Sequence, residues 1–194
     1  NLVAVLGIVT AVGSMISMAL CPLLIKKLDE KKAYIILSVY GFAASIFSFV
    51  IGHFWFKSPD NMVLTVLFYA SLFLIGLQFG AVTLMPMIMT ADAVDYYEYE
   101  TGKRMEGACY SILTLTIKVC LALGTAVGLI FVQQSGYYEG LTTGTFTTNT
   151  KDIIFFAYTA LPGILALLSI IPMFKYDICG EKKAKISAAL AERR

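Results

Sequence analysis

Five long runs of apolar residues dominate this sequence, and they restrict it to a membrane fold. They cover residues 3–25, 34–54, 63–89, 108–133 and 153–174. A helix needs roughly 20 residues to cross a hydrocarbon layer of about 30 Å, so each run is long enough. Hydrophobic residues make up 58% of the chain and charged residues 14%, far from the balance of soluble domains. Because the runs are continuous and do not alternate with polar residues, we expect an all-α bundle of five transmembrane helices.

The lysine and arginine residues predict how this bundle is oriented. Twelve of them flank one side of the predicted spans, whereas only Lys57 and Lys151 flank the other. Under the positive-inside rule, the side with twelve is cytoplasmic. We therefore expect an integral membrane protein, typical of a bacterial inner membrane, with residue 1 outside and the C-terminus in the cytoplasm.

The two ends of the chain carry further expectations. The sequence starts at Asn1 with no signal peptide before the first run, and five spans are an odd number, so we expect a piece of a longer protein. The bundle should occupy residues 1–177 and a cytoplasmic tail residues 178–194. Ile186 and Leu190 lie among basic residues there, which is typical of a helix on the membrane surface, while a solvated tail is the alternative.

Lys118 is the most informative single residue, because no acidic residue accompanies it in the fourth run. A charge at bilayer depth costs about 3 kcal/mol, so it faces a cavity or a partner. Lys118 lies roughly 16 Å beyond Gly107 at 1.5 Å per residue, close to the midplane. Ser111, Thr114, Ala122 and Thr125 share its helix face at spacings of three or four residues. A structural site on backbone carbonyls is the alternative.

Other polar residues could line the same cavity. Gln78, between Gly76 and Gly80 in the third run, fits either an interhelical hydrogen bond or a ligand contact. Thr83 and Tyr110 are further candidates to line the cavity. The two glycines have the spacing that permits close helix packing.

The connection predicted between the third and fourth helices, residues 91–107, is dense in charge. Its gate candidates are Asp92, Asp95, Glu98, Arg104 and Glu106. Ion pairs among them at a cytoplasmic helix junction would close a gate and break when it opens. A helix cap combined with a topology signal is the alternative.

The stretch from Pro86 to Glu106 also resembles a family signature. Its ADAVDY core, followed by TGKR and EG, is similar to that of the glycoside–pentoside–hexuronide:cation symporters, the melibiose-permease branch of the major facilitator superfamily. The similarity continues through Tyr110, Ser111, Thr114 and Lys118.

The resemblance implies that the chain corresponds to helices eight to twelve of a twelve-helix transporter, with the first helix of its half missing. It places Lys118 and Thr114 in the sugar cavity and the acidic segment at the cytoplasmic closure. It also implies that the coupling cation, Na⁺ or H⁺, binds in the absent N-terminal half. Leu113 and Thr83 stand where melibiose permease has glutamine and tryptophan, so a pentoside, a hexuronide or another glycoside fits as well as melibiose.

The resulting hypothesis is a sugar:cation symporter that works by alternating access. Its partners would be a sugar, the lipid bilayer and its own N-terminal half. Two alternatives keep the fold, namely a sodium-coupled lysophospholipid transporter and a non-transporting scaffold or sensor. The sequence has no nucleophile–base pair, metal-ligand cluster or phosphate-binding loop, so we expect no enzyme, no cofactor, no metal site in this fragment and no nucleic-acid partner.

Overall fold

The computed structural model describes the backbone of residues 2–193 and the side chains of residues 7–192. Five helical segments in this part of the chain are long and apolar enough to cross a membrane, which confirms the predicted all-α bundle. The segments are α1 (Leu2–Leu28), α2 (Glu30–Lys57), α3 (Met62–Thr101), α4 (Glu106–Gln134) and a last span made of α6 (Thr148–Tyr158), α7 (Ala160–Leu168) and α8 (Ile170–Met173). Two further helices, α5 (Tyr137–Thr143) and α9 (Gly180–Arg193), lie at the ends of the bundle.

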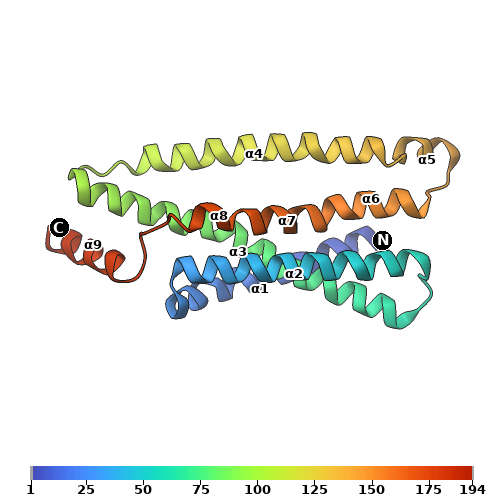
Figure 1. Cartoon of the computed structure of the whole chain (residues 1–194), viewed down its shortest axis with the longest axis horizontal. Coiled ribbons are helices and arrows are strands. Elements are labelled where there is room, and N and C mark those ends of the chain that lie inside the picture. The colour runs from blue at the N-terminus through green and yellow to red at the C-terminus, as the bar shows by residue number, and fades with distance from the viewer. Residues whose placement is uncertain (1, 194) are drawn as a thin grey trace.

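Long helices that follow one another in the chain run in opposite directions, so α1 and α3 run the same way (Figure 1). Helix α3 packs mainly on α1 and α2, and α2 also packs on α7. Helix α4 lies at the edge of the bundle, and none of its described side chains is buried. The turn between α1 and α2 lies at the left in Figure 1, close to Lys26, Lys27, Lys31 and Lys32. We call this the lysine-rich end, and the end that carries α5 the opposite end.

Close backbone contact joins α1 to α3, as the glycine spacing predicted. A Cβ atom on Gly76 would collide with the backbone carbonyl oxygen of Thr10, and one on Gly80 with that of Ser14. The prediction that Gly76 and Gly80 permit close helix packing is therefore confirmed. Gly124 and Gly128 on α4 have the same spacing, but a Cβ on either would have no atom within 4 Å, so they allow no close contact with the described helices.

Helix α3 corrects the predicted connection at residues 91–107. It runs unbroken for 40 residues, through Pro86 and on to Thr101, about twice what a bilayer needs. It stops where Gly102 takes a left-handed conformation, with φ of 69°, and donates its N–H to the Glu98 carbonyl. Charged residues form helices readily in water. The charged residues after residue 91 therefore indicate that α3 leaves the bilayer there, and not that the helix ends. The true connection is residues 102–105.

The last predicted span, residues 153–174, is divided by short breaks at Thr159 and Ser169. Each break lies three residues before a proline, Pro162 or Pro172. Proline removes an N–H donor and crowds the carbonyl four residues earlier, which explains both positions. The pieces still follow one another in one direction across the bundle (Figure 1).

The C-terminal tail folds back onto the bundle. Residues 180–193 form α9, which packs on α3 at the lysine-rich end. Its apolar residues Ile186 and Leu190 are buried. The tail is therefore helical, but it presents its apolar side chains to protein, which neither the membrane-surface helix nor the solvated tail predicted.

Candidate functional site

A polar groove on α4 contains the predicted residue Lys118. It has a volume of about 400 Å³ and is lined by Gly107, Tyr110, Ser111, Thr114, Leu115 and Lys118. These residues lie three or four positions apart on a helix, so they share one face. The structure thus brings together three of the five predicted substrate-binding residues: Lys118, Thr114 and Tyr110.

The groove offers both donors and acceptors of hydrogen bonds. The hydroxyl of Ser111 donates to the Gly107 carbonyl at 2.7 Å, and that of Thr114 to the Tyr110 carbonyl at 2.8 Å. Each hydroxyl oxygen therefore keeps lone pairs that can accept a bond from a ligand. The ammonium of Lys118 lines the groove and has no ion pair or hydrogen bond with any described residue, so its three donors are available to a ligand.

The other two predicted substrate-binding residues lie elsewhere. Gln78 is buried between α2 and α3, where it packs on Gly41 and its Oε1 accepts a hydrogen bond from the Ser45 hydroxyl at 3.3 Å. Of its two predicted roles, this geometry is that of the interhelical bond. Thr83 is exposed on α3 and donates to the Phe79 carbonyl at 2.8 Å. Neither residue lines the groove that contains Lys118.

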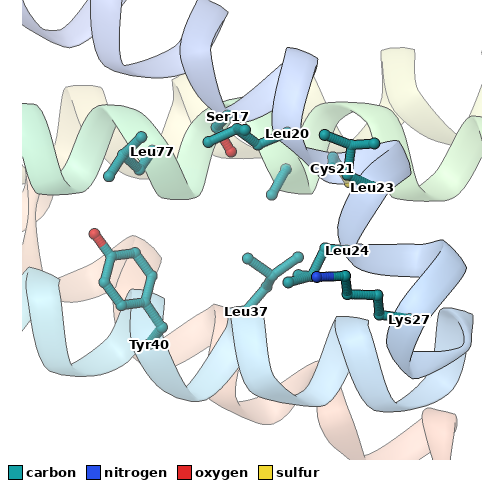
Figure 2. A pocket seen from close by; sticks show the side chains of 10 residues that line it. Ser17, Leu20, Cys21, Leu23, Leu24, Lys27, Leu37, Tyr40 and Leu77 are labelled. Carbon is teal, nitrogen blue, oxygen red and sulfur yellow. The ribbon is translucent and has the colours of Figure 1, made fainter.

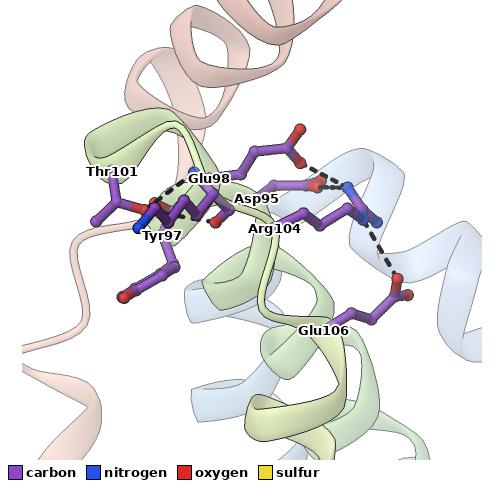
Figure 3. A network of polar contacts seen from close by, with 7 residues as sticks. Asp95, Tyr97, Glu98, Thr101, Arg104 and Glu106 are labelled. Carbon is purple, nitrogen blue, oxygen red and sulfur yellow. Dashed lines mark hydrogen bonds and ion pairs between the residues drawn. The ribbon is translucent and has the colours of Figure 1, made fainter.

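Four of the five gate candidates form one ion cluster at the lysine-rich end (Figure 3). The guanidinium of Arg104 contacts Asp95 at 3.2 Å and Glu98 at 2.7 Å on α3, and Glu106 at 3.2 Å on α4. Hydrogen bonds to Glu98 and Glu106 raise the pKa of Arg104 above its already high ordinary value, so it stays charged. We call these four residues the Arg104 cluster, which ties the end of α3 to the start of α4.

The fifth gate candidate, Asp92, belongs to a different cluster, which corrects the predicted set of five. Lys183 of α9 contacts Asp92 at 2.7 Å and also pairs with Glu30 at the start of α2. The Tyr176 hydroxyl donates to Asp92 at 3.5 Å. Asp92 thus pairs with residues of α9 and the segment before it, whereas Arg104 pairs with Asp95, Glu98 and Glu106. We call Lys183, Glu30, Asp92 and Tyr176 the tail clasp.

Both carboxylates of the tail clasp are buried, at 5% exposure for Glu30 and 7% for Asp92. Burial alone would lower the pKa of Lys183, but its hydrogen bonds to Asp92 and Glu30 and their charges outweigh burial and raise this pKa. Burial raises the pKa of Tyr176, and the nearby charges of Asp92 and Glu30 raise it further. Close by, Lys31 donates to the carbonyls of Phe174 and Tyr176 at 3.1 and 3.0 Å.

Sequence reasoning missed Glu30, Lys183 and Tyr176. Glu30 and Lys183 are 153 positions apart, and no spacing rule relates residues at that distance. The sequence offered one indication of this cluster, namely that Glu30 is an acidic residue among lysines on the expected cytoplasmic side. No group of three or more His, Cys, Asp or Glu able to hold a metal occurs among the described residues.

The opposite end of the bundle joins α2 to α6 through a polar pair. His53 Nδ1 lies 2.8 Å from Asp152 Oδ2. Close by, the Trp55 ring stacks on Phe68 with centroids 4.6 Å apart, and its Nε1 donates to the Thr65 hydroxyl. These contacts are between protein groups, so they stabilise the ends of the helices.

Comparison with known proteins gives a family and several relatives. Residues 1–180 match the model of the family described as MFS/sugar transport protein. The putative sulfoquinovose importer of Escherichia coli K12 is 25% identical over 197 residues, which cover 100% of this chain and 39% of the importer. The glucuronide carrier protein homolog of the same organism is 24% identical, over 94% of this chain and 37% of that protein.

The inner membrane symporter YicJ of Escherichia coli K12 is 30% identical over 115 residues, 59% of this chain and 25% of that protein. The chain therefore spans about two fifths or less of the length of these three relatives. No solved structure matches it.

Proposed function

Because this chain belongs to the MFS/sugar transport protein family, we propose that it is the C-terminal part of a sugar transporter coupled to Na⁺ or H⁺. The resemblance to the glycoside–pentoside–hexuronide symporters is confirmed by this match. The observation that carries the proposal is Lys118, a cation without a described partner, in a polar groove on a membrane-spanning helix. Such a lysine marks a substrate path or a missing partner.

An anionic sugar is the substrate class that this groove suits best. Two relatives are named for sulfoquinovose and for glucuronide, which carry a sulfonate and a carboxylate. In the proposed complex, Lys118 donates to the anionic group, and the hydroxyl oxygens of Thr114 and Ser111 accept bonds from sugar hydroxyls. The phenol of Tyr110 lies one turn further toward the lysine-rich end and supplies a stacking surface. A charge-assisted hydrogen bond of this kind contributes about 1.5–3 kcal/mol.

Cation binding and gating are proposed to involve different parts of the full-length protein. The coupling cation is proposed to bind in the part of the relatives' length that this chain does not cover. The membrane is proposed to be a bacterial inner membrane, with the lysine-rich end in the cytoplasm. The Arg104 cluster then contributes to the cytoplasmic gate, because it fixes the end of α3 to the start of α4 at the lysine-rich end, where the two halves of such a transporter close.

Uptake by the full-length protein in proteoliposomes tests the substrate site. Lys118→Ala is expected to lower uptake of a labelled glucuronide by about tenfold or more, because a charge-assisted bond is lost. Lys118→Arg should retain part of the activity. The matched control is Lys57→Ala, an exposed lysine at the opposite end, which should leave uptake unchanged.

A neutral glycoside provides the second arm of this experiment. If the anionic group binds Lys118, uptake of a neutral glycoside falls much less in Lys118→Ala than uptake of the glucuronide. Unchanged glucuronide uptake at normal protein levels would refute the site. Binding of sugar without any flux in the wild type would instead favour the scaffold or sensor.

A further inference from the structure

A second groove lies between α1 and α2, with α3 as its floor, and it is separate from the groove of Lys118 (Figure 2). Its volume is about 410 Å³, within the range of ligand sites. The walls are almost entirely apolar and include Leu20, Leu24, Leu37 and Leu77. Leu20 is 54% exposed, so the groove opens at the surface of membrane-spanning helices.

The length and position of this groove match one leaflet of a bilayer. Along α1 it extends from Ser17 to Lys27, a rise of about 15 Å at 1.5 Å per residue. A hydrocarbon core of about 30 Å gives each leaflet the same depth. The groove therefore has the length of one acyl chain that reaches from the lysine-rich end to the middle of the membrane.

One cation lines the groove, at its membrane-surface end. The side chain of Lys27 extends over the groove toward Leu24 and Leu37 (Figure 2). No described residue forms an ion pair or hydrogen bond with it. A lysine near the membrane surface attracts anionic headgroups, and the apolar walls beside it suit a hydrocarbon chain, so both features fit a ligand with an anionic head and an apolar tail.

We propose that this groove binds an anionic phospholipid from the leaflet at the lysine-rich end. One acyl chain lies along the groove between α1 and α2, and the headgroup phosphate contacts Lys27. The site differs from the substrate groove in every lining residue, so it is independent of which sugar the protein carries.

Native mass spectrometry of the full-length protein in detergent tests this proposal, with phosphatidylglycerol and phosphatidylcholine as probes. Wild type should retain phosphatidylglycerol about fivefold more than phosphatidylcholine, since one lysine near the surface contributes about 1 kcal/mol. Lys27→Gln should abolish this preference, and Lys27→Arg should keep it. Lys26→Gln removes the same charge from a residue outside the groove and should change the preference by less than twofold.

A second pair of variants tests the acyl-chain path. Leu20→Trp fills the groove and should lower retention of both lipids, whereas Met18→Trp, also exposed on α1 but outside the groove, should not. Equal retention of the two lipids by wild type, or equal effects of Lys26→Gln and Lys27→Gln, would overturn the proposal. So would a photo-crosslinker at Leu20 that captures an upstream segment of the chain in place of lipid.

Discussion

Three lysines show how differently one side chain is used in this protein. Lys183 pairs with two buried carboxylates, although the sequence places it in a basic tail with no sign of a partner. Lys118 and Lys27 form no described ion pair or hydrogen bond, although each lines a groove. A buried ion pair stabilises only when its geometry compensates for desolvation, so the unpaired lysines are the ones available to ligands.

At the same scale, Gly76 is a position where one methyl group should matter. Gly76→Ala is expected to lower the free energy of unfolding by about 1–3 kcal/mol, because the added Cβ collides with the Thr10 carbonyl and the backbones must separate. Thermal unfolding of the full-length protein in detergent, followed by cysteine reactivity, measures this change.

Gly7→Ala is the matched control for that measurement. A Cβ on Gly7 would have no atom within 4 Å, so the substitution should be neutral or stabilise by up to about 1 kcal/mol through helix propensity. Equal midpoints of thermal unfolding for Gly76→Ala and Gly7→Ala would show that the close contact between α1 and α3 does not determine stability.

At the scale of elements, α3 and α9 depend on each other. The last turns of α3 extend beyond the expected membrane boundary, and α9 covers them with Ile186 and Leu190. The tail clasp then joins α9 to both α3 and α2 through Lys183. A charged helix extension and a basic tail, each unremarkable alone, form one interface.

The tail clasp predicts that α9 is released at alkaline pH. The pKa values of Lys183 and Tyr176 are both raised in the folded state, so docked α9 holds these protons more tightly than free α9. The stabilisation is complete below the ordinary values of about 10.4 for lysine and about 10 for tyrosine. It is lost as pH rises through the higher folded values. The distance between spin labels on α9 and α2 should increase above about pH 10.

Two variants distinguish this mechanism from general alkaline unfolding. Lys183→Met leaves Glu30 and Asp92 buried without their cation, so α9 should already be released at neutral pH. Lys185→Met, an exposed neighbour, should keep the wild-type transition. A wild-type profile in Lys183→Met would rule out the clasp as the cause.

At the scale of the whole molecule, α4 and the group of α1, α2 and α3 are connected weakly along their length. Helix α4 has no buried side chain among those described, and the Arg104 cluster links it to α3 at the lysine-rich end. The N-terminal half proposed above would pack on this exposed helix.

Arg104→Gln is therefore expected to loosen the junction of α3 and α4, so that the groove of Lys118 becomes more accessible from the lysine-rich end. Exposed ion pairs are individually weak, so the rate at which a thiol reagent modifies a cysteine introduced at Thr114 should rise only about two- to fivefold. The rate is measured in proteoliposomes, with the reagent added on the side to which the lysine-rich end of the protein is exposed. Lys103→Gln removes a neighbouring charge outside the cluster and serves as control, and an equal rise in both variants would exclude a specific gate.

Particular residues show how much could be predicted. The spans followed from run length, and the groove around Lys118 followed from spacing, because both depend on local periodicity. The prediction that residues 91–107 connect the third and fourth helices was wrong, because a helix that leaves the bilayer becomes polar without ending. Asp92 was grouped with Arg104 because they are close in sequence, whereas its partner Tyr176 is 84 positions away.

The sequence by itself determined the five helices, the face that carries Lys118 and the membrane family, since hydropathy and helical period are properties of neighbouring residues. Only the tertiary structure decided that Gln78 bonds across to Ser45, that Lys183 joins Glu30 to Asp92, and that Lys27 overhangs an apolar groove. Each of these depends on how separate helices pack, and packing brings together residues that no local pattern relates.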